Sequence, residues 1–162
     1  VVEPPAPEKI EQILEQVKRE IGLALSSKQE AAVYAAYRHN LSIITGSPGT
    51  GKTTVLKTIL EVYRRLHPQG EIALMAPTGR ASRRMAESTG VDKAKTLHSI
   101  LGLASEEDEI KRNNTQEPLS ADLIIVDEFS MVDMWLANKF FSRIKGGARV
   151  ILVGDPDQLP SL

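Results

Sequence analysis

The feature that most constrains the fold of this chain is the glycine-rich run GSPGTGKT at residues 46–53. It has the spacing of a glycine, four free positions, a second glycine, a lysine, and then a serine or threonine. An apolar run at residues 41–45 precedes it, and a helical pattern at residues 52–66 follows it. Glycines let backbone N–H groups curl around phosphate oxygens, and the start of a helix adds a positive dipole end. The sequence therefore predicts a strand, a phosphate-binding loop and a helix, in that order.

Two side chains of this loop have specific roles in the prediction. Lys52 can reach the β- and γ-phosphates of a nucleotide, and the Thr53 hydroxyl can coordinate Mg²⁺. Thr54 is expected to pack and cap more than to bind. The predicted nucleotide-binding set of the loop comprises Gly46, Ser47, Pro48, Gly49, Thr50, Gly51, Lys52, Thr53 and Thr54.

Short apolar runs alternate with helical patterns along most of the chain. The expected strands are residues 41–45, 71–76, 122–126 and 149–153, and the expected helices among them are residues 52–66, 80–88 and 135–144. Strands that are apolar throughout and alternate with helices are typical of a parallel sheet covered on both faces. The predicted fold class is therefore α/β, with a P-loop and a parallel sheet between helices.

Two further helices are expected before the first strand. Ile10, Leu14 and Val17 recur at helical spacing among charged residues, which predicts an amphipathic helix. A second helix is expected to start near Ser27, with Ser27 and Glu30 as a capping box. Residues 104–120 are acidic and polar and are expected to form a solvated loop. We divide the chain into a linker with the N-terminal helix, residues 1–24, and one domain, residues 25–162.

Composition excludes some functions and leaves others open. The chain has no cysteine, which excludes disulfides and thiolate metal sites, and no apolar run is long enough to cross a membrane. Its 41% hydrophobic and 25% charged residues are usual for a soluble domain, and we expect a cytoplasmic protein. Because the net charge is −1 and aromatic residues make up only 4%, any DNA binding must use a local basic surface.

Carboxylates follow the third expected strand. Asp127 and Glu128 come directly after it, at the edge where parallel sheets bind ligands. Asp127 is placed to hold Mg²⁺ through water together with Thr53, and Glu128 to orient or deprotonate an attacking water. Alone, the pair could equally be a favourable helix start; together with the phosphate loop it indicates catalysis. Gln158, in the GDPDQLP run after the fourth strand, could either reach the γ-phosphate or belong to a turn.

Six strings, LSSKQ, GSPGTGKTT, APTGRAS, TLHSI, DEFSM and GDPDQLPS, together resemble superfamily 1 helicases. The resemblance is strongest to the RecD-like and TraI-like group, which moves 5′ to 3′ on single-stranded DNA. It covers roughly residues 25–162. The resemblance implies that the sheet is the first RecA-like motor domain of an ATP-dependent DNA helicase with a role in repair or recombination.

The resemblance also implies roles at the matching positions. Gln29 of LSSKQ is similar to a glutamine that recognises adenine, and Gln158 is similar to a residue that couples the γ-phosphate to the DNA track. The implied contacts to single-stranded DNA are Thr78, Gly79, Arg80, Thr96 and His98. The residues alone leave other readings open: a core histidine at 98, and a solvated helix face for Arg80, Arg83 and Arg84. Phe129 and Trp135 are expected in the core.

A helicase of this group has a second RecA-like domain, which supplies an arginine to the phosphoryl group, with ATP in the cleft between the two domains. We therefore expect the 162-residue chain to bind Mg·ATP weakly, to hydrolyse it slowly and not to unwind DNA. Whether the whole protein acts alone or in a nuclease complex stays open. Two rival functions also stay open: a P-loop ATPase of another class, such as a clamp loader or AAA-type switch, and a non-catalytic DNA-binding module.

Overall fold

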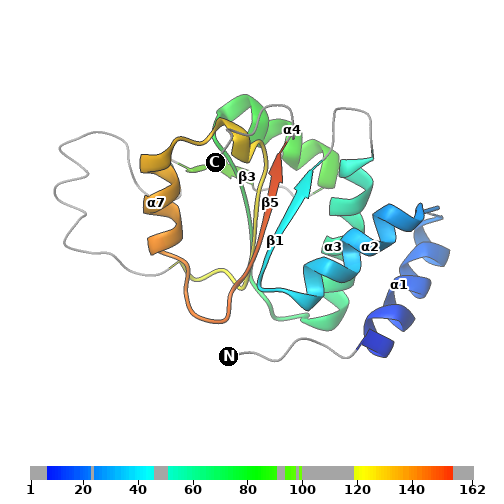
Figure 1. The fold of residues 1–162 in the computed structure, drawn as a ribbon. Helices are drawn as coiled ribbons and strands as arrows, with labels where there is room; N and C mark the ends of the chain where they lie inside the picture. The colour runs from blue at the N-terminus through cyan, green and yellow to red at the C-terminus, as the bar shows by residue number, and fades with distance from the viewer. Residues whose placement is uncertain are drawn as a thin grey trace.

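The structure, a computed structural model, describes residues 7–22, 24–45, 51–90, 94–97, 99 and 119–154. Helices and strands alternate over most of these ranges (Figure 1). The elements are α1 (Pro7–Ile21), α2 (Ser27–Arg38), β1 (Leu41–Thr45), α3 (Lys52–Leu66), β2 (Ile72–Ala76), α4 (Gly79–Thr89), β3 (Ala94–Thr96), β4 (Leu123–Val126), the short 3₁₀ helix η1 (Phe129–Met131), α7 (Met134–Ser142) and β5 (Arg149–Gly154).

The described strands form one parallel five-stranded sheet in the order β1-β5-β4-β2-β3. Helices α1, α2 and α3 lie on one side of it and α7 on the other (Figure 1). A parallel sheet needs such covers, because each connection between its strands crosses over a face. The predicted α/β fold with helices on both faces is confirmed. In the described ranges, no helix combines the length and apolarity that crossing a membrane requires.

Strand β4 shows how the sheet builds two cores. All four of its residues are buried, and successive side chains point to opposite faces. Leu123 and Ile125 belong to the core under α1, α2 and α3, and Ile124 and Val126 to the core under α7. This arrangement explains why the strand is apolar throughout.

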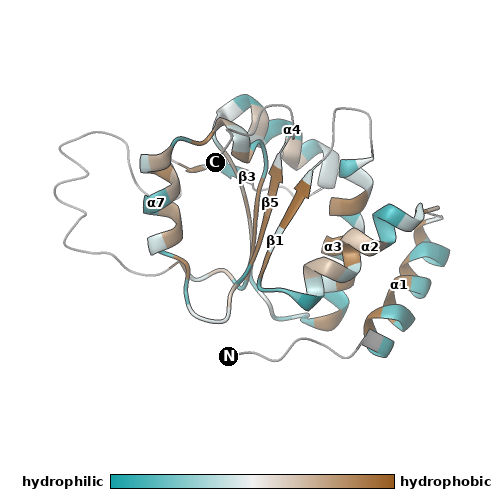
Figure 2. Ribbon diagram, in the orientation of Figure 1, coloured by the Kyte–Doolittle hydropathy of each residue, from teal (hydrophilic) through white to brown (hydrophobic). Residues whose placement is uncertain are grey.

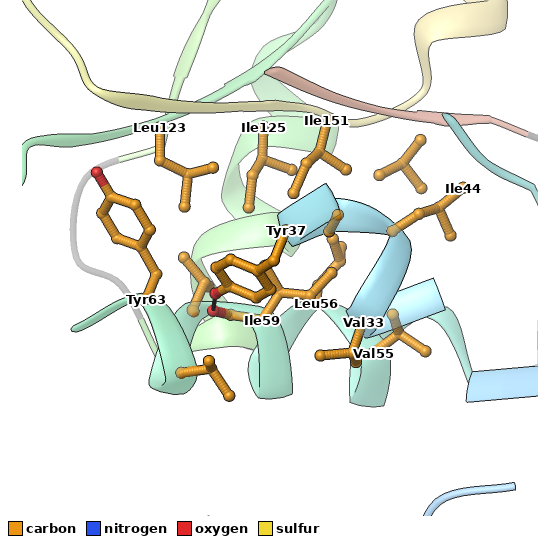
Figure 3. Packing of buried hydrophobic residues seen from close by; sticks show 14 of the residues in the cluster. Val33, Tyr37, Ile44, Val55, Leu56, Ile59, Tyr63, Leu123, Ile125 and Ile151 are labelled. Carbon is orange, nitrogen blue, oxygen red and sulfur yellow. Dashed lines mark hydrogen bonds between the residues drawn. The ribbon is translucent and has the colours of Figure 1, made fainter. Parts of the chain in front are cut away.

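The larger core lies between the sheet and α3 (Figure 3). Val55, Leu56 and Ile59 of α3 are buried in this core, and the Tyr37 hydroxyl of α2 donates a hydrogen bond to the carbonyl oxygen of Ile59. The predicted amphipathic helix is α1, whose Ile10, Leu14 and Val17 are buried in this core. Its hydrophilic residues lie on the outward side (Figure 2).

Several local predictions were wrong. The capping box of α2 is formed by Ser26 and Gln29, one residue earlier than predicted, and Glu30 instead forms an ion pair with Lys18 of α1. The third strand of the chain, β3, was not predicted, because only one of its three residues is apolar. Other element ends shifted by one or two residues, within the usual fraying of helix and strand ends.

Two expectations of burial also differ. Trp135 is 45% exposed, since the core under α7 is filled by Leu136 and Phe140 instead. Ile43 of β1 is 63% exposed, because β1 is at the edge of the described sheet. Phe129 packs against the core under α7, as expected, although it is only partly buried.

Candidate nucleotide-binding site

The residue that directly precedes α3 is a glycine with a left-handed backbone conformation. Gly51 caps α3 with φ of 85°, a backbone conformation that side chains strongly disfavour. Its carbonyl oxygen accepts the first helical hydrogen bond, from the Val55 N–H at 3.2 Å. Gly51 has no side chain with which to cap this helix start, and the N–H groups at the start of a helix are suited to bind an anion. Lys52 and Thr53 are the first two residues of that turn.

Gln29 contacts the same glycine. Its side-chain Nε2 donates to the carbonyl oxygen of Gly51 at 3.5 Å, and its Oε1 accepts from the Ser26 N–H at 2.8 Å. The Ser26 hydroxyl in turn accepts from the Gln29 N–H at 3.2 Å. The residue predicted to recognise adenine therefore lies at the end of the phosphate loop, and both ends of its amide are engaged there.

Strand β4 ends at the two predicted carboxylates. The Asp127 side chain accepts a hydrogen bond from the Glu128 N–H at 2.8 Å, and the Asp127 N–H donates to the carbonyl oxygen of Met75. Glu128 has φ of 50° and ψ of 41°, the left-handed region, and no other described residue except glycine has a positive φ. For a residue with a side chain this conformation costs about 1 kcal/mol or more. Such strain is common at functional sites, because it directs a side chain that the relaxed backbone would aim elsewhere.

A pocket of about 220 Å³ brings the predicted residues together. Lys52 and Thr53 of α3 line it on one side, and Asp127 and Glu128 line it after β4. The sheet register explains this meeting, because both strands that lead to these residues end at the same edge of a parallel sheet.

The described residues of the pocket offer few oxygen ligands, which suits Mg²⁺ bound together with a nucleotide better than a metal ion whose ligands all come from the protein. Thr53 contributes a hydroxyl and Asp127 a carboxylate, of which one oxygen is engaged by the Glu128 N–H. Among the residues described, no group of three or more His, Cys, Asp or Glu side chains could hold a metal. Mg²⁺ usually keeps several water molecules and takes phosphate oxygens as further ligands, so the Thr53 hydroxyl could bind it directly and Asp127 through a water molecule.

Three of the predicted DNA contacts lie at the start of α4, directly after β2, and a fourth, Thr96, is the last residue of β3. Thr78 caps α4, and its hydroxyl accepts from the Ala81 N–H at 3.1 Å; Gly79 and Arg80 come next and are exposed. The Thr96 hydroxyl at the end of β3 accepts from the Ser99 N–H at 3.1 Å. Since Thr96 pairs in register with Ala76, these residues lie at the carboxyl edge of the sheet, the edge at which Asp127 follows β4.

Several predicted site residues lie outside the described residues: Gly46, Ser47, Pro48, Gly49, Thr50, His98 and Gln158. Strand β5, which leads toward Gln158, ends at Gly154 in register with Thr45, the last residue before the phosphate loop. Thr54, expected mainly to pack, is partly buried, and its carbonyl oxygen accepts from the Thr58 hydroxyl at 2.8 Å.

One charged residue that lines the pocket was not predicted as part of the site. Arg84 of α4 lines it together with Ser88 and Thr89, and it is also exposed, which agrees with the solvated helix face left open by the sequence. Helical spacing could have indicated this, because Arg84 and Ser88 lie one turn apart beside the buried Ala81 and Met85.

The fold and the site define a P-loop nucleotide-binding domain. A sequence model of the family described as an AAA domain matches residues 29–162, and the chain belongs to that family. The resemblance to RecD-like helicases is confirmed. The chain is 42% identical over 136 residues to an ATP-dependent RecD2 DNA helicase of Deinococcus radiodurans, covering 84% of this chain and 18% of the relative. It is 38% identical to the RecBCD enzyme subunit RecD of Haemophilus influenzae, covering 83% of this chain and 24% of the relative.

Among solved structures, the chain is similar to DNA helicases of the Pif1 type. Pif1 helicase from Candida albicans matches with a TM-score of 0.59 and 32% identity, covering 86% of this chain and 34% of that one. A Bacteroides Pif1 helicase in complex with ADP-AlF3 and single-stranded DNA matches with a TM-score of 0.55 and 25% identity, again over 86% and 34%. The chain thus spans about a fifth to a third of the length of these proteins.

Proposed function

We propose that this chain is the ATP-binding motor domain of a 5′-to-3′ DNA helicase that couples ATP hydrolysis to translocation on single-stranded DNA. The observation that carries the proposal is the pocket that Lys52 and Thr53 line together with Asp127 and Glu128. The first pair follows the phosphate loop after β1, and the second pair follows β4, which is separated from β1 in the sheet by β5 alone. A lysine, a hydroxyl and two carboxylates around a helix start are the groups that phosphoryl transfer from Mg·ATP needs.

In this mechanism each residue has a separate task. Lys52 and the first N–H groups of α3 neutralise the negative charge that develops on the phosphates. Thr53 and Asp127, the latter through water, would hold Mg²⁺, which would polarise the terminal phosphoryl group. Glu128 orients a water molecule for in-line attack and accepts its proton. Its left-handed backbone and the hydrogen bond from its N–H to Asp127 fix the two carboxylates relative to each other.

Adenine recognition by Gln29 is part of the proposal, and its place beside Gly51 supports it. An amide can both accept from and donate to the adenine edge, so it can distinguish ATP from GTP. In the structure this amide bonds to Ser26 and Gly51, and at least one of those bonds must be exchanged when the base is read.

The helicase assignment rests on the relatives. Every relative described above is a helicase or a subunit of RecBCD, and the Bacteroides structure contains single-stranded DNA. We assign Thr78, Gly79, Arg80, Thr96, His98 and Gln158 to the DNA contact and its coupling to the γ-phosphate. Hydroxyls, backbone N–H groups and a cation are the partners that DNA phosphates accept. We further propose a cytoplasmic location, a second RecA-like domain in the whole protein, and a domain start near residue 25. An assembly with nuclease subunits would match RecD.

Two rival functions have less support. An ATPase of the clamp-loader or switch type fits the family description and the pocket, but the relatives above are helicases. A non-catalytic DNA-binding module would have no need of the complete set Lys52, Thr53, Asp127 and Glu128.

The first experiment is a titration of Mg·ATP and Mg·GTP into this chain by calorimetry. We expect measurable ATP binding, weaker GTP binding and loss of both in Lys52→Ala. Lys57→Ala is the matched control, because Lys57 is exposed on the same helix and does not line the pocket. Unchanged binding in Lys52→Ala would refute the nucleotide site.

Stimulation by DNA tests the helicase assignment. In the whole protein, ATP hydrolysis should rise on addition of single-stranded DNA, and Arg80→Ala should reduce that rise. The 162-residue chain alone should hydrolyse ATP slowly and unwind nothing, since an arginine from a second domain can be worth ~10³–10⁵ in rate. ATPase activity of the isolated chain near that of the whole protein would contradict this part of the proposal.

A further inference from the structure

Helix α4 presents two different faces. Arg80, Arg83 and Glu87 do not line the nucleotide pocket. Arg84 lines the pocket together with Ala81, Met85, Ser88 and Thr89. The two neighbouring arginines, Arg83 and Arg84, therefore have different surroundings although both are exposed and on the same helix.

Arg84 is available to a ligand. It makes no hydrogen bond or ion pair with any residue in the part of the chain that the structure describes. An arginine that stabilised the fold alone would be expected to hold a carboxylate or a carbonyl. Asp127 and Glu128 line the same pocket, so Arg84 lies among the groups proposed to act on the phosphates, and none of the described residues engages its donors.

A second cationic side chain in the pocket would help to balance the negative charge of the two carboxylates and of a bound nucleotide. The basic residues that line the pocket are Lys52 and Arg84, and the acidic ones are Asp127 and Glu128. Mg·ATP brings further net negative charge into this small volume. Without Arg84, Lys52 would be the single cationic side chain among the lining residues described, facing two carboxylates and the phosphates.

The position of Arg84 indicates which part of the nucleotide it meets. Helix α3 contacts α2 on one side and α4 on the other. Gln29 of α2, the proposed adenine reader, contacts Gly51 and does not line the pocket. Arg84 of α4 lines the same pocket as Glu128, the residue proposed to hold the attacking water. The base end and the Arg84 end of the site are thus on different helices.

We propose that Arg84 donates hydrogen bonds to the terminal phosphate of bound ATP, and so distinguishes the triphosphate from ADP within this domain. The inference rests on the proposed nucleotide site and adds a phosphate-binding cation that belongs to the domain itself. A guanidinium suits this task, because its planar donors can engage two phosphate oxygens at once.

The test compares Arg84→Gln with Arg83→Gln in the whole protein, without DNA. Binding of Mg·ADP and of a non-hydrolysable ATP analogue with Mg²⁺ is measured by calorimetry, and thermal unfolding checks that each variant is folded. We expect Arg84→Gln to weaken the triphosphate analogue about tenfold or more relative to ADP, since a charge-assisted hydrogen bond is lost. Arg83→Gln should match the wild type, and Arg84→Lys should recover part of the loss.

The other outcomes are distinguishable. Equal affinities in Arg84→Gln and Arg83→Gln would overturn the role of Arg84 and leave the nucleotide site intact. Equal weakening of ADP and the triphosphate in Arg84→Gln would also overturn it, since the residue would then act on the site as a whole. Failure of the wild type to bind either nucleotide would overturn this inference and the proposed function together.

Discussion

The side-chain amide of Gln29 donates to the carbonyl oxygen of Gly51 at 3.5 Å, and this contact joins the start of α2 to the start of α3. Gln29 therefore has two separable functions, a structural one in the capping box and a proposed one in base recognition. A ligand that engages this amide competes with bonds inside the protein, so base binding and the geometry of the phosphate loop are linked.

Substitution of Gln29 separates the two functions when it is compared with Ser26→Ala. Both changes damage the capping box and should lower the free energy of unfolding by about 1 kcal/mol. Only Gln29→Ala should also reduce the preference for ATP over GTP, because it is the Gln29 amide that contacts Gly51. Denaturant unfolding and nucleotide titration measure the two effects. An unchanged ATP preference in Gln29→Ala would remove the adenine assignment.

Gly51→Ala should destabilise the domain by roughly 1–3 kcal/mol, for two reasons. Its φ of 85° disfavours any side chain, and a Cβ at this position would run into the Gln29 amide. Gly146→Ala is the control, because a Cβ there meets nothing within 4 Å. In a double-mutant cycle, Gln29→Ala should relieve the clash and leave the backbone strain. Additive effects of Gly51→Ala and Gln29→Ala would show that the clash contributes nothing.

Glu128 should show opposite effects on stability and activity. Glu128→Gly removes the cost of a left-handed backbone and should raise the free energy of unfolding by about 1 kcal/mol while it abolishes hydrolysis. Glu128→Gln keeps the side-chain shape and should retain Mg·ATP binding with hydrolysis reduced by about 10²-fold or more. Calorimetry and single-turnover hydrolysis in the whole protein provide both measurements. Near-normal hydrolysis in Glu128→Gln would exclude it as the base.

Asp122, which precedes β4 at the end of the strand away from the pocket, gives a prediction about pH. The hydrogen bond from Lys145, and then the one from the Glu71 N–H, lower the pKa of the Asp122 carboxyl. A carboxyl whose pKa is lowered by folding stabilises the protein above its unfolded pKa of about 3.9, and the benefit is lost as pH falls through the folded value. Asp122→Asn should therefore cost stability at pH 7, at most about 1 kcal/mol for so exposed a pair, and progressively less below about pH 4.

The matched control is Lys145→Met, which removes the partner of the Asp122 carboxylate. The stability cost of Asp122→Asn should therefore depend less on pH in the Lys145→Met background than in the wild-type background. Urea unfolding at a series of pH values measures this cost in both backgrounds. A cost that is independent of pH in both would show that the ion pair does not form in solution.

The parts of the fold that could be predicted from sequence are those with a local signal. The apolar run of β4 and the glycine spacing around Lys52 indicate structure and chemistry within a few residues. Strand β3 has no such signal, since it is held by pairing with β2 rather than by apolar side chains. The cap of α2 also depends on residues far away in the sequence. Glu30, which was expected to complete the capping box, forms an ion pair with Lys18 of α1 instead.

The site shows the same division. The residues of the phosphate loop and the pair Asp127 and Glu128 could be recognised from spacing, but the left-handed backbone of Glu128 could not. Arg84 was missed because sequence shows which residues share a helix face but not what that face meets. Helical spacing groups Arg84 with Ser88, Ala81 and Met85, but that this group lines the same pocket as Lys52 and Asp127 follows from the packing of α4, which the structure shows.

Strand β1 has a consequence for handling the protein. Within the part of the chain that the structure describes, it is hydrogen-bonded to another strand on one side only, and Leu41 and Ile43 on it are more than half exposed. Backbone N–H and C=O groups along such a strand can pair with a second copy of the same strand. A preparation of this chain should therefore be kept dilute. Its loss by precipitation on concentration would reflect this strand edge, with nucleotide binding still intact in the material that stays dissolved.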